Sequence, residues 1–360
     1  MSTLIRGRDA STFAPPVGRR SAFLLERPKN VTKLTGAAFS WKYLSSLIAV
    51  DKREPRRPTR KERWIITNLA EDSGIAKVLC ELPAVDPAER EIWLHFAGLF
   101  PKPFTSGAEL EWEDFERDNI RATRNIARLV SSRNPSARLF FPSTALLLCE
   151  GVIDDIKMRQ YADSKLVCER LLTRIAPTQT AYWRLVRIIG VDRQRECSTP
   201  ALFPDDSLLH QVLLQGRSTG DLPDDVISSF LIKATENPIR PLIRVTNCDF
   251  VRTYMHISDL LGSLLNLIDS DSFGLAGSTP PVPSAITLET IGRVVQEGLR
   301  KSGLLVELRA TPAGVKSVVS PSPNTNGQVC VNAKDSAETV RRAMCEYLEL
   351  ASQFVAGTYS

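Results

Sequence analysis

With 360 residues, of which 43% are hydrophobic and 24% charged, the chain has an ordinary globular composition and room for one large core plus a smaller lobe, or for two domains. Its net charge of +5 is too small to imply a polyanionic partner, and no apolar run approaches the roughly 18 residues that cross a bilayer. The seven cysteines are scattered without a CxxC pair, which indicates a reducing compartment with neither a disulfide framework nor a structural metal site.

The first thirty residues have the composition of a polar tail. Residues 1–30 are rich in arginine, serine and proline and lack the apolar core of a secretory signal. Their scarcity of acidic residues leaves a mitochondrial presequence open, but Asp9, the pair Pro15-Pro16 and the absence of an amphipathic period favour disorder. We therefore predict a disordered tail over 1–30 and a cytoplasmic protein.

From about residue 31, short apolar runs alternate with helical patterns, which is typical of βαβ units around a parallel sheet. The predicted strands are 31–35, 47–50, 63–67, 92–97, 138–143 and 183–189. Helices are expected at 109–131, 157–174 and 335–353. After Gly190 the alternation becomes irregular, so the sequence predicts an α/β core over 31–190 and a mainly C-terminal lobe over 191–360, with segments returning to the core.

A run of basic residues follows the second predicted strand. Its members are Lys52, Arg53, Arg56, Arg57, Arg60, Lys61 and Arg63. A solvated loop is the simplest interpretation. A site for a ribose phosphate, or a nuclear-localisation or nucleic-acid patch, are the alternatives. No aromatic residue interleaves with the run before Trp64, so base stacking has little support.

Polar or small residues stand at the ends of several predicted strands. Asp51 ends LIAVD, Asn68 follows WIIT, and FFPST ends in Ser143-Thr144. Ligands of open α/β sheets bind where the carboxyl ends of parallel strands meet. An acidic residue at the end of the second strand suits the two hydroxyls of an adenosine ribose.

The segment YADSK puts Tyr161 four residues before Lys165. On a helix this spacing puts both side chains on one face, about one turn apart. An ammonium beside a phenol stabilises the phenolate and lowers a pKa that starts near ~10, which makes tyrosine a usable acid or base near neutral pH. By itself the pattern is weak, because any exposed Tyr-xxx-Lys pair satisfies it.

Four motifs in the same order resemble the extended short-chain dehydrogenase/reductase superfamily, in the NAD-dependent epimerase/dehydratase family that includes UDP-glucose 4-epimerase. HFAG at 95–98 is similar to its H-x-A-A/G strand end, and DNIRATRNI at 118–126 to its N-x-x-G-T-x-N helix, with Ala122 in place of glycine. STA at 143–145 followed by YADSK resembles the catalytic segment, and VRTYMHISDL at 251–260 resembles R-D-F-x-H-V-x-D-L. The resemblance spans about 31–350 and implies a Rossmann-like doubly wound parallel sheet with a smaller C-terminal substrate lobe.

The resemblance also implies roles for individual residues. Tyr161 would pass a proton to or from a substrate hydroxyl, Lys165 would hold the nicotinamide ribose and lower the tyrosine pKa, and Thr144 would hydrogen-bond the reacting oxygen. Arg252 matches a position that contacts a nucleotide-sugar pyrophosphate. The positions implied in cofactor binding are Gly36, Asp51, Asn68, Ala97, Tyr161 and Lys165.

The glycine-rich turn departs from the family pattern. In TGAAFSWK at 35–42 only Gly36 survives, and Phe39 and Lys42 stand where the family has glycines that let a pyrophosphate approach the backbone. The stretch from Thr35 to Asp51 is also too short for a full helix between two strands. Either normal dinucleotide binding has been lost or coding sequence is missing from the gene model.

The sequence thus predicts an NAD- or NADP-dependent oxidoreductase or epimerase acting on a secondary alcohol or ketone, in a nucleotide sugar or a small metabolite. Asp51 favours NAD, whereas the basic run keeps NADP open. The alternative is a catalytically impaired relative with a binding or scaffold role, and a nucleic-acid-associated protein is a weaker third. No membrane partner is expected, and a homodimer is compatible with the resemblance.

Overall fold

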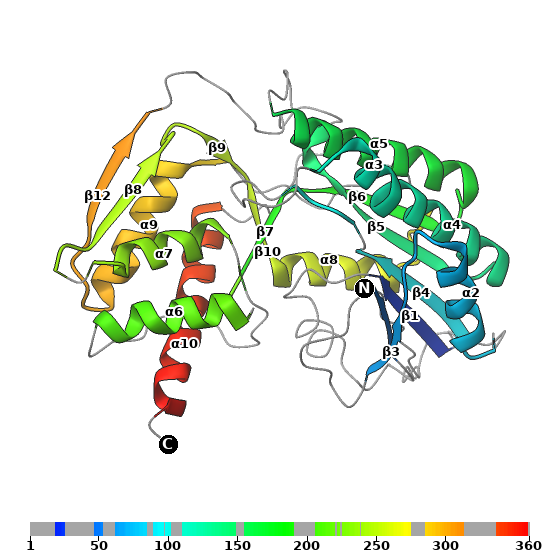
Figure 1. Cartoon of the computed structure of the whole chain (residues 1–360), viewed down its shortest axis with the longest axis horizontal. Helices are drawn as coiled ribbons and strands as arrows, with labels where there is room; N and C mark the ends of the chain where they lie inside the picture. The colour runs from blue at the N-terminus through cyan, green and yellow to red at the C-terminus, as the bar shows by residue number, and fades with distance from the viewer. Residues whose placement is uncertain are drawn as a thin grey trace. The chain divides into compact units, whose positions relative to one another are not determined.

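The computed structural model describes 19–25, 47–52, 62–84, 89–96, 98–101, 110–148, 155–190, 206–219, 222–223, 225–237, 239–274, 285–312 and 336–358 (Figure 1). The chain forms two compact units. The first comprises Met1–Leu147, Val152–Leu185 and Leu264–Pro280, and the second comprises Leu148–Gly151, Val186–Ser263 and Pro281–Ser360. Among the described helices, none is both long and apolar enough to cross a membrane.

The first unit is built on a six-stranded sheet whose neighbouring strands are all parallel. Along the chain the strands are β1 (Arg19–Leu25), β2 (Leu47–Asp51), β3 (Glu62–Ile66), β4 (Glu89–His95), β5 (Arg138–Thr144) and β6 (Thr180–Leu185). In space their order across the sheet is β3-β2-β1-β4-β5-β6. This is the strand order of doubly wound dinucleotide-binding sheets. The predicted Rossmann-like α/β class is confirmed.

Helices of the first unit pack against this sheet, and Figure 1 shows α2, α4 and α5 together on one face. They are α2 (Asp72–Glu81), α3 (Trp112–Phe115), the π-helical η2 (Glu116–Arg121), α4 (Ala122–Arg133) and α5 (Ile156–Ile175), with the short 3-10 turn η3 (Ala145–Leu148) after β5. The helix predicted at 109–131 is therefore three consecutive segments, and the helix predicted at 157–174 is α5.

The position of the first strand corrects the sequence prediction. β1 lies at Arg19–Leu25, inside the stretch predicted as a disordered tail, and it pairs with both β2 and β4. The predicted strand at 31–35 lies outside the described residues. Because β1 ends at Leu25, the chain between β1 and β2 runs over 26–46 and is longer than the stretch counted from Thr35. The count from Thr35 therefore does not apply to this strand, and the two explanations of the altered glycine-rich turn stay predictions.

Strand β5 shows how the sequence shapes the site. Its residues are nearly all buried, as expected for a parallel strand covered on both faces. Its pairing with β4 ends at Phe140, so Pro142, which has no backbone N–H, lies beyond the last β4 partner. The strand continues along β6 to Thr144, which pairs with Leu185.

In the part of the second unit that the structure describes, five helices combine with three two-stranded ladders. Its strands are β7 (Arg187–Ile189) parallel to β10 (Tyr254–His256), β8 (Leu242–Thr246) parallel to β12 (Glu307–Thr311), and β9 (Val251–Arg252) antiparallel to β11 (Ile286–Thr287). Its helices are α6 (Asp206–Thr219), α7 (Val226–Thr235), the start of α8 (Ile257–Asp269), α9 (Leu288–Lys301) and α10 (Ser336–Thr358). α10 is the helix predicted at 335–353.

Buried polar groups anchor α10 within the second unit. The Tyr347 hydroxyl donates to the Asp225 carboxylate and accepts the Gly190 backbone N–H at 2.9 Å. His256 Nε2 lies 2.9 Å from Glu346 Oε2, and both side chains are fully buried. Gly190 has a φ of 92°, and a Cβ there would lie 2.1 Å from His256 Nε2, so only glycine fits.

Candidate functional site

The candidate catalytic side chains come from β5 and α5. Thr144 is the last residue of β5 and is buried, and its Oγ1 accepts the Leu146 N–H at 3.3 Å. α5 begins after Asp155, whose carboxylate caps the helix by accepting the Lys157 and Met158 N–H groups. The Tyr161 hydroxyl, from the second turn of α5, makes a side-chain hydrogen bond with Thr144. The structure therefore brings Thr144 and Tyr161 together.

Lys165 lies one turn after Tyr161 on the buried side of α5, with 5% of its surface exposed. Its Nζ donates to the Pro142 carbonyl at 3.1 Å, 4.5 Å from the centroid of the Phe141 ring. The same Nζ is 5.8 Å from the centroid of the Tyr161 ring. The ammonium is thus beside the tyrosine, and the end of β5 holds it in place.

The electrostatics differ from the sequence expectation. Burial raises the pKa of Tyr161, and its hydrogen bond with Thr144 only partly offsets this. Burial lowers the pKa of Lys165 to about 8. The predicted lowering of the tyrosine pKa by Lys165 is wrong for this arrangement, because Nζ points at the Pro142 carbonyl and desolvation of the phenolate dominates.

Ser143 and Thr144 have separate environments. Ser143 Oγ donates to Glu169 Oε1 at 2.5 Å, and Arg184 donates to both oxygens of the same carboxylate at 3.0 and 2.8 Å. Glu169 is 3% exposed. Because Ser143 is committed to this buried ion pair, Thr144 is the strand-end hydroxyl that meets Tyr161. Glu169 carried no prediction from the sequence, although its position one turn after Lys165 was a usable signal.

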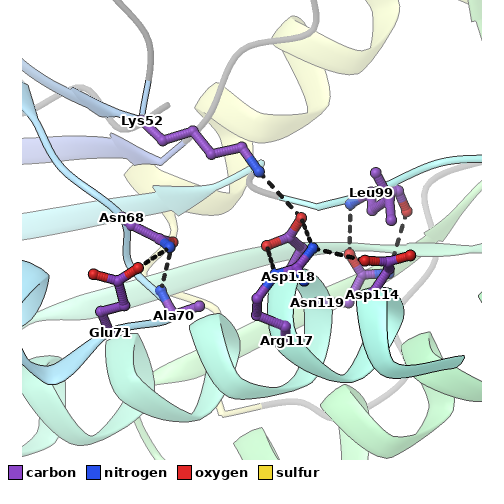
Figure 2. A network of polar contacts seen from close by, with 9 residues as sticks. All are labelled: Lys52, Asn68, Ala70, Glu71, Leu99, Asp114, Arg117, Asp118 and Asn119. Carbon is purple, nitrogen blue, oxygen red and sulfur yellow. Dashed lines mark hydrogen bonds and ion pairs between the residues drawn. The ribbon is translucent and has the colours of Figure 1, made fainter. Parts of the chain in front are cut away.

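Asn119 joins three elements around the candidate site. Its Oδ1 accepts the Leu99 N–H at 2.5 Å, and its Nδ2 donates to the Leu99 carbonyl at 3.2 Å (Figure 2). The same Nδ2 donates to Ser164 Oγ at 2.9 Å. It lies in the π-helical turn η2, and such turns are frequent at functional sites. Asn119 begins the N-x-x-A-T-x-N match, but only the structure reveals that it fixes the loop after β4 against α5.

The backbone at Gly98 comes close to the same groups. A Cβ at this position would lie 3.2 Å from Asn119 Oδ1 and 3.5 Å from Lys165 Nζ. Nearby, His95 ends β4, is fully buried and lies 2.9 Å from Thr123 Oγ1 through Nε2. Burial, together with Lys165, lowers the His95 pKa well below its usual range, so this imidazole is neutral.

At the ends of β2 and β3 lie the residues predicted to contact adenosine. Asp51 ends β2, and the following Lys52 forms an ion pair with Asp118 at 3.1 Å (Figure 2). Asn68 serves the start of α2, since its Oδ1 accepts the Ala70 N–H at 3.1 Å and its Nδ2 donates to Glu71 at 2.7 Å. Asp51 thus stands at the predicted sheet edge, whereas the Asn68 amide is occupied locally.

Three further residues carried a role in the sequence prediction. Gly36 and Ala97 fall outside the described residues. Arg252 belongs to β9 in the second unit, where its guanidinium lies 5.2 Å from the Phe250 ring centroid and donates to the Val251 carbonyl at 3.2 Å. The structure therefore assembles Thr144, Tyr161 and Lys165 in the first unit.

No family model and no curated protein matches the chain. Solved structures do match. A structure of UDP-galactose 4-epimerase aligns with 84% of this chain and 90% of the epimerase chain, at 16% identity and a TM-score of 0.53. The structure of MoeE5 in complex with UDP-glucuronic acid and NAD aligns with 90% of this chain and 94% of the MoeE5 chain, at 16% identity and a TM-score of 0.54. The chain shares their fold. The resemblance read from the four motifs is confirmed at the level of the fold.

Proposed function

We propose that the chain is an NAD-dependent oxidoreductase or epimerase acting on a secondary alcohol or ketone, in a nucleotide sugar or a related small metabolite. The observation that carries this proposal is the meeting of Thr144, Tyr161 and Lys165 beyond the carboxyl end of β5. Similar structures are solved with NAD and with UDP-glucose or UDP-glucuronic acid, which supports this class of cofactor and substrate.

The described residues fit a nicotinamide dinucleotide at several points. The close backbone approach at Gly98, where a Cβ would approach Lys165 Nζ, suits a flat ring lying over the strand ends. The buried Lys165 ammonium can donate to ribose hydroxyls, and Asp51 at the end of β2 can accept from the adenosine ribose. When bound, NAD supplies the hydride acceptor or donor for the carbinol carbon.

Proton handling falls to the chain's own side chains. Tyr161 begins as a neutral phenol and so carries a proton that it can pass to a carbonyl oxygen, while burial, which raises its pKa, makes it a weaker acid than a solvated tyrosine. In the opposite direction Tyr161 must first be the phenolate, which an approach of Lys165 Nζ would stabilise, and it becomes the neutral phenol when it accepts the hydroxyl proton. Thr144, hydrogen-bonded to Tyr161, can orient the same substrate oxygen.

The environment of Lys52 supports NAD over NADP. Lys52 directly follows Asp51 and is the nearest described cation in sequence to the ribose-binding position. Its ammonium is paired with Asp118, which Arg117 also contacts at 3.1 Å. Lys52 is a poor partner for a 2′-phosphate because its ammonium is already paired with Asp118, and the Asp51 carboxylate would repel that phosphate. Asp51 is, however, a good acceptor for a 2′-hydroxyl.

A calorimetric titration with NAD⁺, NADH, NADP⁺ and NADPH tests the cofactor. Product analysis with UDP-glucose and UDP-glucuronic acid then tests turnover. Tyr161→Phe is expected to lower kcat by at least about a hundredfold while leaving cofactor affinity within about twofold, since it removes only the acid–base proton. Asp163→Asn, an exposed change on the same helix, is the control. Full activity of Tyr161→Phe would remove Tyr161 from the mechanism.

One sequence feature favours a second candidate, a catalytically impaired protein with a binding role. The chain that directly follows β1 contains no glycine between Leu25 and Gly36, where dinucleotide-binding folds have a glycine-rich turn. The same titration separates the two candidates. Absence of binding of all four nucleotides at millimolar concentration, with a folded protein, would favour the binding role and reject the enzyme.

A further inference from the structure

A hollow of about 370 Å³ opens beside α5, away from the set of residues proposed for catalysis. It lies between this helix and β6, the last strand of the sheet. Its lining includes Leu166, Arg170, Thr173, Arg174 and Tyr182, together with the Glu169–Arg184 ion pair. All of these residues belong to the first unit. A volume of this size suits a small ligand.

The charges around the hollow do not balance. The Glu169 carboxylate is used by Arg184, in a bidentate pair, and by Ser143. Arg170 and Arg174 are exposed, and neither has a carboxylate partner among the residues that the structure describes. Within the described residues, two positive charges without a carboxylate partner therefore stand one turn apart on the rim of a hollow whose own carboxylate, Glu169, is already paired.

Such a pair is unfavourable without an anion. Like charges at i and i+4 on a helix repel each other, and the repulsion is relieved when an anion binds between them. Guanidinium groups match the oxygens of phosphate with two parallel hydrogen bonds each. The Thr173 hydroxyl donates its proton to the Glu169 backbone carbonyl at 2.9 Å, so it is not a donor for the anion. Burial and Glu169 raise the pKa of Tyr182, so its hydroxyl stays protonated and able to donate.

We propose that this hollow binds a small phosphate-bearing anion, held mainly by Arg170 and Arg174. Its apolar contact with the ligand comes from Leu166 and from the Tyr182 ring. The proposal is independent of the dinucleotide, because none of its residues belongs to the set proposed for catalysis. An extended polyanion, such as RNA, is the competing occupant, and the small volume argues against it.

The test is a titration of the full chain with inorganic phosphate and with glucose 1-phosphate, at constant ionic strength. Saturable binding is expected for the wild type, and the double variant R170Q/R174Q should weaken it by at least about tenfold, since two charge-assisted contacts are lost. The control R121Q/R128Q removes the same charge from exposed positions of η2 and α4. It should change the affinity by less than about twofold.

Three results would overturn the proposal. One is the absence of saturable binding of either phosphate to the wild type. A second is an equal loss in both double variants, which would mean a general charge effect. A third is binding of a single-stranded RNA oligomer alone. NAD⁺ titration of R170Q/R174Q distinguishes this site from the proposed active site, because NAD⁺ affinity should stay unchanged, and a melting curve verifies that the variant is folded.

Discussion

At the scale of single residues, burial decides the chemistry of the candidate site more than pairing does. Tyr161 and Lys165 each lose solvation of their charged form, so the phenol is held protonated and the ammonium is weakened. Without a bound cofactor or substrate, Tyr161 is therefore held as the neutral phenol. A phenolate would need Lys165 to turn away from the Pro142 carbonyl, which it contacts in this structure.

Lys165→Met is expected to stabilise the fold near pH 7. The pKa of Lys165 is about 8 in the folded protein and 10.5 for an ordinary lysine, because burial favours the neutral amine. The folded state is therefore relatively more stable above pH 10.5, where the amine is neutral, and loses this stability as the pH falls through 8 and the buried amine becomes charged. Removing the ammonium should thus raise the free energy of unfolding at pH 7 by about 1–3 kcal/mol. The loss of the Lys165 contacts with the Pro142 carbonyl and the Phe141 ring reduces this gain.

Urea denaturation of this variant from pH 6.5 to 9.5 measures the effect. The advantage over the wild type should shrink as the pH rises through about 8, where the folded wild type loses its buried charge. Lys77→Met, at an exposed position of α2, should show no such trend. A constant difference across the pH range would mean that Lys165 is not a destabilised ammonium.

Asp118→Asn should relax the preference for NAD. The substitution removes the carboxylate that pairs with Lys52 at 3.1 Å, so the Lys52 ammonium becomes available beside the ribose-binding Asp51. The ratio of NADP⁺ to NAD⁺ affinity is expected to rise by about three- to tenfold, as one new partly exposed ion pair implies. Calorimetric titration of both nucleotides gives the ratio, and an unchanged ratio would show that Lys52 does not face the ribose.

At the scale of elements, the apolar runs predicted five strands and the three long helices with small shifts at their ends. The predicted runs at 47–50 and 138–143 correspond to β2 and β5, whereas the run at 183–189 covers the end of β6 and all of β7, a strand of the second unit. The π-helical turn at Glu116–Arg121 could not be predicted, because it interrupts a continuous helical pattern without changing its composition. Its consequence is the placement of Asn119 against Leu99 and Ser164.

Tyr347→Phe tests the anchoring of α10 in the second unit. The variant leaves the Gly190 N–H and Asp225 Oδ2 without the Tyr347 hydroxyl, while Asp225 Oδ1 keeps the Ile227 and Ser228 N–H groups. Each buried group that loses its partner costs about 1–3 kcal/mol. We expect the free energy of unfolding of the second unit to fall by about 2–4 kcal/mol. Calorimetry of the thermal transition measures the loss, and Tyr182→Phe, in the half-buried edge strand of the other unit, provides the comparison.

At the scale of the whole molecule, β1 is the element on which the first unit depends. It lies between β2 and β4, so without it the sheet would be divided into two smaller sheets, each with a new unpaired edge strand. Proline has no N–H for a ladder and does not fit a strand with neighbours on both sides. The segment predicted to be a tail is therefore expected to be intolerant of proline.

Phe23→Pro in β1 is expected to prevent folding of the first unit, whereas Phe23→Val, which keeps strand propensity and the N–H, should fold. Soluble yield and amide hydrogen exchange of the six strands measure the outcome. Equal folding of both variants would mean that residues 19–25 do not form the central strand.

The sequence by itself determined the alternation of strands and helices and the order of Thr144, Tyr161 and Lys165 along the chain. These features were enough to predict the fold, because hydrophobic periodicity and motif spacing are local properties of the sequence. Only the tertiary structure decided which segment is β1, since a strand's partners, here β2 and β4, are distant in sequence. It also decided that Glu169 holds Ser143 and that burial opposes charge on Tyr161. Desolvation and the choice of hydrogen-bond partner depend on everything that packs around a group, and no local pattern carries that information.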